Sequence, residues 1–146
     1  MIIRLGTDIV YIPRIAAALD RFGDRFLQRV YTQAEQQDCG CIQPPTVDYL
    51  TPYLAPLTAQ NSINQLAGRW AAKEAVAKAL LTGFRGLSYT DIEIRRQPNG
   101  APKVFLYGAA ADLAAGWGEC QWQLSLSHDR DYCVATALLI CYYAIP

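Results

Sequence analysis

The sequence lacks the features that mark several large classes of protein. Its 13 basic and 13 acidic side chains give no net charge, whereas a general nucleic-acid binder normally carries a basic excess. It contains neither a P-loop nor a Gly-x-Gly-x-x-Gly motif, so the common nucleotide-binding folds are unsupported. We therefore predict no nucleic-acid partner.

Long hydrophobic runs are missing as well. The longest apolar stretch, 133–146, is too short to cross a bilayer as a helix, and Thr136 interrupts it. The first residues do not have the charged-then-apolar layout of a secretory signal. We therefore expect a cytoplasmic protein with no membrane partner, and we interpret the stretch as a buried strand.

Cysteine and histidine are too few and too irregularly spaced for a zinc site. The chain has five cysteines, at 39, 41, 120, 133 and 141, and one histidine, His128. Cys39 and Cys41 form a lone pair with no second pair to complete four ligands. We predict ordinary free thiols in a reducing cytosol.

The apolar patterns that are present predict an α+β fold with a mostly antiparallel sheet packed against one long and several short helices. The predicted strands cover 2–10, 91–97, 103–107, 121–127 and 132–142. Helical spacing predicts a helix that begins at Ile12 and breaks at Gly23, followed by a second short helix. Further helices are predicted over 32–37, 64–81 and 109–115.

The segment 38–60 has a different composition from the rest of the chain. Four prolines at 44, 45, 52 and 56 exclude a long helix there. It is long for a connection in a small protein. We predict a single domain over 1–146 with a proline-rich loop insertion at about 38–60.

Three short segments contain residues suited to chemistry. Asp8 stands at the end of an apolar strand, where it is either a rigidly mounted metal ligand or a turn-forming aspartate. Glu74 and Lys78 lie four residues apart on one helical face, which is typical of a surface ion pair. Small alanines flank Glu74, however, and leave room for a ligand.

The third segment, 124–129, ends in Ser127, His128 and Asp129. Neighbours in sequence at a strand end cannot form a serine hydrolase triad, and no Gly-x-Ser-x-Gly motif occurs. Their side chains are either phosphate-binding donors or simply a polar hairpin end.

In this order along the chain, these segments resemble the holo-acyl-carrier-protein synthases, the small class of 4′-phosphopantetheinyl transferases. The matching residues are Gly6-Thr7-Asp8-Ile9-Val10, Thr32 to Glu35, Gly68 to Leu80, Asp91 to Ile94, Asn99 to Pro102, and Leu124 to Asp129 before Tyr132. The resemblance covers nearly the whole chain except 39–60.

The resemblance implies transfer of 4′-phosphopantetheine from coenzyme A to a serine of an apo acyl carrier protein, releasing adenosine 3′,5′-bisphosphate. Asp8 and Glu74 match the Mg²⁺ ligands of the family, and Lys78 matches the lysine beside the phosphates. Mg²⁺ takes one or two carboxylates and leaves positions for water and phosphate oxygens. The base is Glu74 or a metal-bound water. Members of the family form homotrimers with interfacial active sites.

Two further hypotheses concern binding. Arg69, Ser127 and His128 would hold a phosphate of coenzyme A. An acidic carrier would need a local basic face, and Arg14, Arg21 and Arg25 form one stripe, with Arg29 nearby, if the helix continues through Gly23.

Two other functions stay open. One is a non-catalytic coenzyme A or nucleotide-binding module on the same fold. The other, suggested by the apolar C-terminal strand, is a protein that serves only in assembly.

Overall fold

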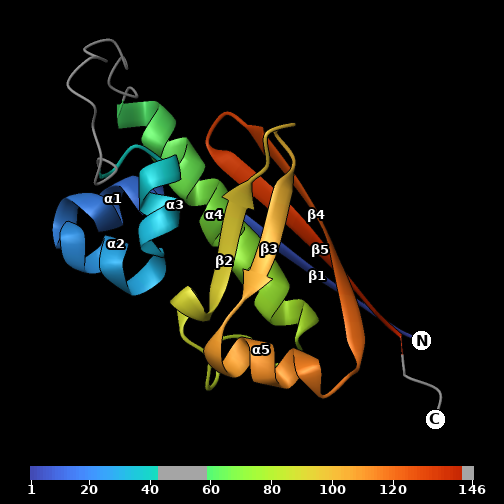
Figure 1. Cartoon of the computed structure of the whole chain (residues 1–146). Helices are drawn as coiled ribbons and strands as arrows, with labels where there is room; N and C mark the ends of the chain where they lie inside the picture. Colours follow the sequence, from blue (N-terminus) through green and yellow to red (C-terminus); the bar gives the residue numbers. More distant parts are fainter. Residues whose placement is uncertain (43–58, 143–146) are drawn as a thin grey trace.

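A long helix lies between two antiparallel sheets in the computed structural model, which describes residues 1–42 and 59–142 (Figure 1). The strands are β1 (Ile2–Tyr11), β2 (Ile92–Arg96), β3 (Pro102–Leu106), β4 (Glu119–Asp129) and β5 (Tyr132–Tyr142). The helices are α1 (Ile12–Phe22), α2 (Asp24–Val30), α3 (Gln33–Asp38), α4 (Ala59–Ala79), the 3₁₀ turn η1 (Tyr89–Asp91) and α5 (Gly108–Ala115). The α+β prediction is confirmed.

The larger sheet has the strand order β1-β5-β4, and all its neighbours are antiparallel. Its inner face packs against α4 through small residues, among them Gly6, Ala135 and Ala137. A Cβ added at Gly6 would collide with the carbonyl oxygen of Ala75 on α4. Glycine at this position therefore allows β1 to lie directly against the helix.

Helix α4 is buried on more than one side because the β2–β3 hairpin covers the side that faces away from the larger sheet (Figure 1). Its alanines at 67, 71, 72, 75 and 77 are completely buried. Small side chains let both layers approach the helix axis closely. Residues of α4 are therefore placed where two sheets and the α1–α3 helices converge.

Most of the predicted elements appear within a few residues of their predicted bounds. The long helix begins at Ala59, five residues before the predicted start, and ends at Ala79. Of the predicted loop, 43–58 lies outside the described residues; Asp38 ends α3 and Gln60 belongs to α4. Among the described helices, none is long and apolar enough to cross a membrane.

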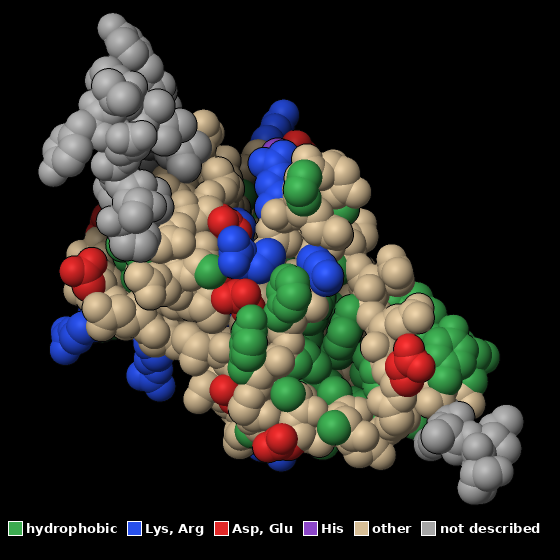
Figure 2. Space-filling model, in the orientation of Figure 1, with side chains coloured by type: hydrophobic (Ala, Val, Ile, Leu, Met, Phe, Trp, Pro, Cys, Tyr) green, Lys and Arg blue, Asp and Glu red, His purple; other side chains and the backbone are tan. Residues whose placement is uncertain are grey.

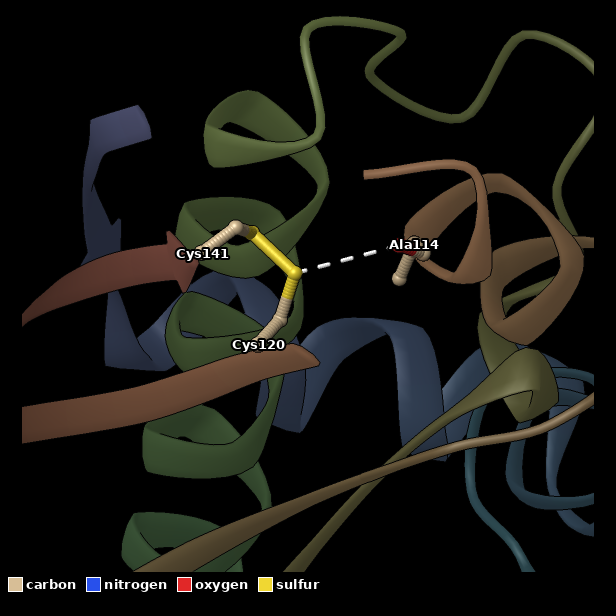
Figure 3. Close-up of a disulfide and its surroundings, with 3 residues drawn as sticks. All are labelled: Ala114, Cys120 and Cys141. Atoms are coloured by element: carbon tan, nitrogen blue, oxygen red, sulfur yellow. Dashed lines mark hydrogen bonds between the residues drawn. A yellow bond between two sulfur atoms is a disulfide. The ribbon is translucent and has the colours of Figure 1, made fainter. Parts of the chain in front are cut away.

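The prediction of free thiols is wrong for two cysteines. Cys120 and Cys141 face each other on β4 and β5, with their Cα atoms 4.0 Å apart, and form a disulfide (Figure 3). The Cys120 sulfur also lies 3.8 Å from the carbonyl oxygen of Ala114 on α5, a contact rather than a donated hydrogen bond because a disulfide sulfur carries no hydrogen. Cys39, Cys41 and Cys133 are free.

Candidate active site

Asp8 and Lys78 meet where β1 crosses α4. The Lys78 ammonium lies 2.9 Å from Oδ1 of Asp8 and donates to the carbonyl oxygen of Thr7 at 2.8 Å. The Asp8 side chain is 17% exposed and that of Lys78 is 48% exposed, so the pair is open to solvent. Lys78 therefore pairs with Asp8 on the sheet rather than with Glu74, its neighbour one helical turn away.

Glu74 is held by a residue that the sequence did not point to. Its Oε1 accepts a hydrogen bond of 2.7 Å from the hydroxyl of Tyr89 on η1. Burial raises the pKa of the Tyr89 phenol well above its usual value, and the adjacent Glu74 carboxylate raises this pKa further, so the phenol stays protonated and donates. Tyr89 lies in the short turn η1, where the sequence has no periodic pattern that would have predicted its role.

Asp8, Glu74 and Arg14 all influence the pKa of the Tyr89 phenol. The charges of Asp8 and Glu74 raise the pKa of Tyr89, whereas the charge of Arg14 lowers it, so all three lie within electrostatic reach of its hydroxyl. Glu74 is one helical turn from Lys78, which pairs with Asp8, so the two carboxylates lie near each other where β1 contacts α4. Arg14, predicted to bind the carrier, stands at the margin of this cluster.

The donor chemistry of this cluster suits a hard divalent cation. Asp8 and Glu74 provide carboxylate oxygens on two rigid elements, and both side chains are partly open to solvent. Mg²⁺ usually binds proteins through one or two carboxylates and fills its other positions with water and substrate phosphates. The described residues contain no group of three or more His, Cys, Asp or Glu side chains that could hold a metal.

A basic groove of about 360 Å³ lies at the opposite edge of the same sheet, between α4, the β2–β3 hairpin and β4. Arg69 and His128, both predicted to bind coenzyme A, line it together with Arg95 and Arg96. Figure 2 shows basic side chains gathered over the hairpin. Ser127 precedes His128 by one residue on a strand and therefore faces the other side of the sheet.

Arg69 is fixed in this groove by three acceptors. Its guanidinium donates to the carbonyl oxygens of Ile94 at 3.2 Å and Gln65 at 3.4 Å, and lies 3.4 Å from Oδ2 of Asp38. Asp38 also pairs with Arg95 at 2.8 Å. The groove therefore presents arginines whose positions are set before any ligand binds.

The four arginines proposed for the carrier lie on two helices and do not form one helical stripe. Gly23 has a φ of 51°, ends α1 and starts α2, so Arg14 and Arg21 belong to α1 while Arg25 belongs to α2. The stripe prediction is corrected by this break. A depression of about 500 Å³ is lined by Phe22, Arg25, Phe26, Arg29, Val30, Trp70 and Tyr89.

A buried ion pair between Lys73 and Glu35, which the sequence analysis did not predict, holds the turn that carries Tyr89. Lys73 Nζ lies 2.7 Å from Oε2 of Glu35, and both side chains are completely buried. Burial lowers the pKa of Lys73, an effect that the Glu35 carboxylate opposes. Lys73 also donates to the carbonyl oxygens of Tyr89 at 2.9 Å and Ile92 at 2.6 Å, which fixes η1 against α4.

Comparison with known proteins agrees with this architecture. The sequence model of the 4′-phosphopantetheinyl transferase superfamily matches residues 4–137. The holo-[acyl-carrier-protein] synthase of Gloeobacter violaceus is 46% identical over 140 residues, covering 96% of this chain and 94% of that protein. The synthase of Koribacter versatilis is 41% identical over 140 residues, covering 95% and 98%. The crystal structure of the Helicobacter pylori synthase in complex with coenzyme A has a TM-score of 0.71 at 29% identity, covering 93% of this chain and 99% of that chain.

The chain therefore belongs to the 4′-phosphopantetheinyl transferase superfamily. Within that superfamily it is a member of the holo-[acyl-carrier-protein] synthase family of transferases. It is similar to members of this family over nearly their full lengths. The resemblance drawn from Asp8, Gly68 to Leu80 and Leu124 to Asp129 is confirmed at the level of the family and the enzyme class.

Proposed function

We propose that this enzyme transfers 4′-phosphopantetheine from coenzyme A to a serine of an apo acyl carrier protein and releases adenosine 3′,5′-bisphosphate. The observation that supports this most is the ion pair between Asp8 of β1 and Lys78 of α4, which lies one helical turn from Glu74. Asp8 and Glu74 would hold Mg²⁺, which when bound neutralises charge on the pyrophosphate of coenzyme A. The proposed setting is the cytoplasm.

The residues of the cluster divide the chemistry between them. The serine Oγ forms a bond to the β-phosphorus of coenzyme A while the bond from this phosphorus to the bridging oxygen breaks. Lys78 stabilises the negative charge that collects on the leaving phosphate. The serine proton goes to the Glu74 carboxylate, directly or through a water.

The basic groove is the proposed site for the adenosine end of coenzyme A. Arg69 and His128, with Arg95 and Arg96, supply donors for a phosphate. Support comes from the relatives of known structure, since the Helicobacter pylori synthase is in complex with coenzyme A. Ser127 lies outside the groove lining and is a weaker candidate.

The acidic carrier is proposed to dock on α1 and α2. Arg14, Arg21 and Arg25 are exposed there, and the aromatic depression beside Arg25 provides apolar contact. Charge complementarity of this kind mainly speeds encounter and fixes the docked orientation.

A homotrimer is proposed because the outer face of the larger sheet is apolar and uncovered in the single chain. Ile3, Leu5 and Ile9 of β1 are 58%, 63% and 62% exposed. Contiguous exposed apolar side chains of this kind usually mark an interaction surface. Subunits joined through this face would bring the edge strand β1, with Asp8, next to a neighbouring chain and thus make interfacial active sites.

The direct test is the intact mass of several apo carrier proteins after incubation with the purified enzyme, coenzyme A and Mg²⁺. At least one carrier should gain one phosphopantetheine group on its serine. A non-catalytic coenzyme A-binding module would bind coenzyme A and leave every carrier mass unchanged.

A further inference from the structure

We propose that Tyr89 is a positioning residue that orients Glu74 and connects this carboxylate to the aromatic depression on α2. Its hydroxyl holds one oxygen of Glu74, and its ring forms part of the depression wall. Because Tyr89 acts on Glu74, this role presupposes the transfer reaction proposed above.

The hydrogen bond restricts a side chain that is otherwise mobile. A glutamate has three rotatable side-chain bonds, and a bond of 2.7 Å from Tyr89 to Oε1 limits their freedom. Because the Tyr89 hydroxyl occupies Oε1, the other oxygen, Oε2, would bind a cation or accept a proton. Orientation of a reacting group before substrate arrives lowers the entropy cost of the reaction.

Tyr89 is itself held in place from several directions. Its carbonyl oxygen accepts from Lys73 at 2.9 Å, and Ser88 and Asp91 cap the turn that carries it. Its ring stacks on Phe84, with centroids 3.7 Å apart, and lies 4.9 Å from the Trp70 ring. The position of the hydroxyl is therefore set by the fold.

The same ring extends the site toward α2. Trp70 lies between Tyr89 and Phe26, with 5.9 Å between the centroids of Phe26 and Trp70. Phe26, Trp70 and Tyr89 all line the depression beside Arg25 and Arg29. An apolar side chain of a docked carrier would thus touch the ring whose hydroxyl orients Glu74.

The test is Tyr89→Phe, which removes the hydroxyl and keeps the ring. Hydrogen bonds to charged groups are stronger than those between neutral groups. We therefore expect the affinity for Mn²⁺, a paramagnetic substitute for Mg²⁺, to fall about tenfold or more. Mn²⁺ binding is measured by electron paramagnetic resonance with coenzyme A present and carrier absent. kcat should fall by a similar factor, while KM for the carrier stays within about twofold.

Tyr107→Phe is the matched control. The Tyr107 hydroxyl also donates to a carboxylate, Oε1 of Glu93 at 3.3 Å, but this pair is not part of the Asp8 and Glu74 cluster. Mn²⁺ affinity and kcat should therefore be unchanged in this variant. Replacing the ring in Tyr89→Leu should, in addition to the losses of Tyr89→Phe, raise KM for the carrier several-fold.

Tyr89→Phe enzyme that binds Mn²⁺ and turns over like the wild type would overturn the positioning role. Tyr89→Leu enzyme with an unchanged carrier KM would overturn the connection to the depression. Failure of the wild type to modify any carrier would instead reject the proposed reaction, and the Mn²⁺ measurement distinguishes the two because it needs no turnover.

Discussion

At the scale of single residues, the carboxylates of this chain differ in what surrounds them. Asp8 and Glu74 are partly open to solvent, and the structure gives each a polar partner at the surface of α4. Glu35 is completely buried and bound to Lys73, Thr32 and Ile94. Of these three, Asp8 and Glu74 are the ones whose side chains solvent can reach.

Asp8→Asn and Glu74→Gln should each reduce transfer at least about 100-fold, because a neutral amide is a poor ligand for Mg²⁺. The thermal midpoint should change little, since both side chains are partly exposed. Radiolabel transfer from coenzyme A at limiting Mg²⁺ measures the loss. Asp112→Asn, on the exposed face of α5, should behave like the wild type. Near-normal turnover of either site variant would reject the metal assignment.

Lys73→Met should destabilise the protein by about 3–5 kcal/mol, because it leaves the Glu35 charge buried without its counterion. Urea unfolding followed by circular dichroism measures this free energy. Lys103→Met, at an exposed position of β3, should cost less than about 0.5 kcal/mol. A loss at Lys73 as small as at Lys103 would show that the buried pair is not formed.

The sequence analysis predicted some of these residues and missed others. Asp8, Glu74 and Lys78 were predicted as site residues because they stand in short motifs that resemble a known family. Tyr89 and Glu35 were missed because their roles depend on partners 15 and 38 residues away, Glu74 and Lys73, which only the folded chain brings near. No local pattern encodes such a pairing.

At the scale of elements, the contact between β1 and α4 determines the geometry of the cluster. Asp8 lies on β1 and Lys78 on α4, so the distance between strand and helix sets whether they meet. Gly6, two residues before Asp8, provides the close approach.

Gly6→Ala should therefore push α4 away from β1 and destabilise the protein by about 3 kcal/mol or more, as overpacking does in close-packed interiors. The transfer rate should also fall, because the Asp8 to Lys78 contact is disturbed. Gly68→Ala on α4 is the control: its Cβ would meet Leu126 and Cys133 at 3.7 and 3.8 Å, which is ordinary contact. Equal stability of the two variants in urea would contradict the packing account.

Element predictions succeeded where periodicity was strong. Alternation predicted the strands at 91–97 and 121–127, and apolar runs predicted those at 2–10 and 132–142. Gly23 correctly marked the break between α1 and α2. The start of α4 was missed because the polar residues 60–62 follow prolines and show no apolar spacing. The disulfide was missed because Cys120 and Cys141 become neighbours only through the register of β4 on β5.

At the scale of the whole molecule, a net charge of zero conceals an uneven distribution. Arg14, Arg21, Arg25 and Arg29 are all exposed on α1 and α2. Arg14→Glu or Arg21→Glu should raise KM for an acidic carrier at least about fivefold and flatten its dependence on ionic strength. Coenzyme A binding should stay within twofold in Arg21→Glu, since Arg21 is not part of the Asp8 and Glu74 cluster. Lys103→Glu is the control. If Arg14→Glu and Arg21→Glu had the same carrier KM and salt dependence as Lys103→Glu, the proposed docking face would be rejected.

The apolar outer face of the larger sheet leads to a second prediction about assembly. Leu5→Glu places a charge in this face and should shift the proposed trimer toward monomers in light scattering. Leu81→Glu is the control, since Leu81 is 70% exposed just after α4 and does not belong to a strand of the sheet. A wild-type protein that is monomeric at micromolar concentration would contradict the proposed trimer.

The central claim is that the Asp8 and Glu74 cluster catalyses phosphopantetheine transfer, and one mass-spectrometric time course tests it most directly. Apo carrier protein, coenzyme A and Mg²⁺ are incubated with wild-type or Asp8→Asn enzyme, and both products are quantified. The account predicts one adenosine 3′,5′-bisphosphate released for each carrier serine modified, with both products lost in Asp8→Asn and when Mg²⁺ is chelated. Modification that continues at the wild-type rate without Asp8 or without a divalent cation would contradict it.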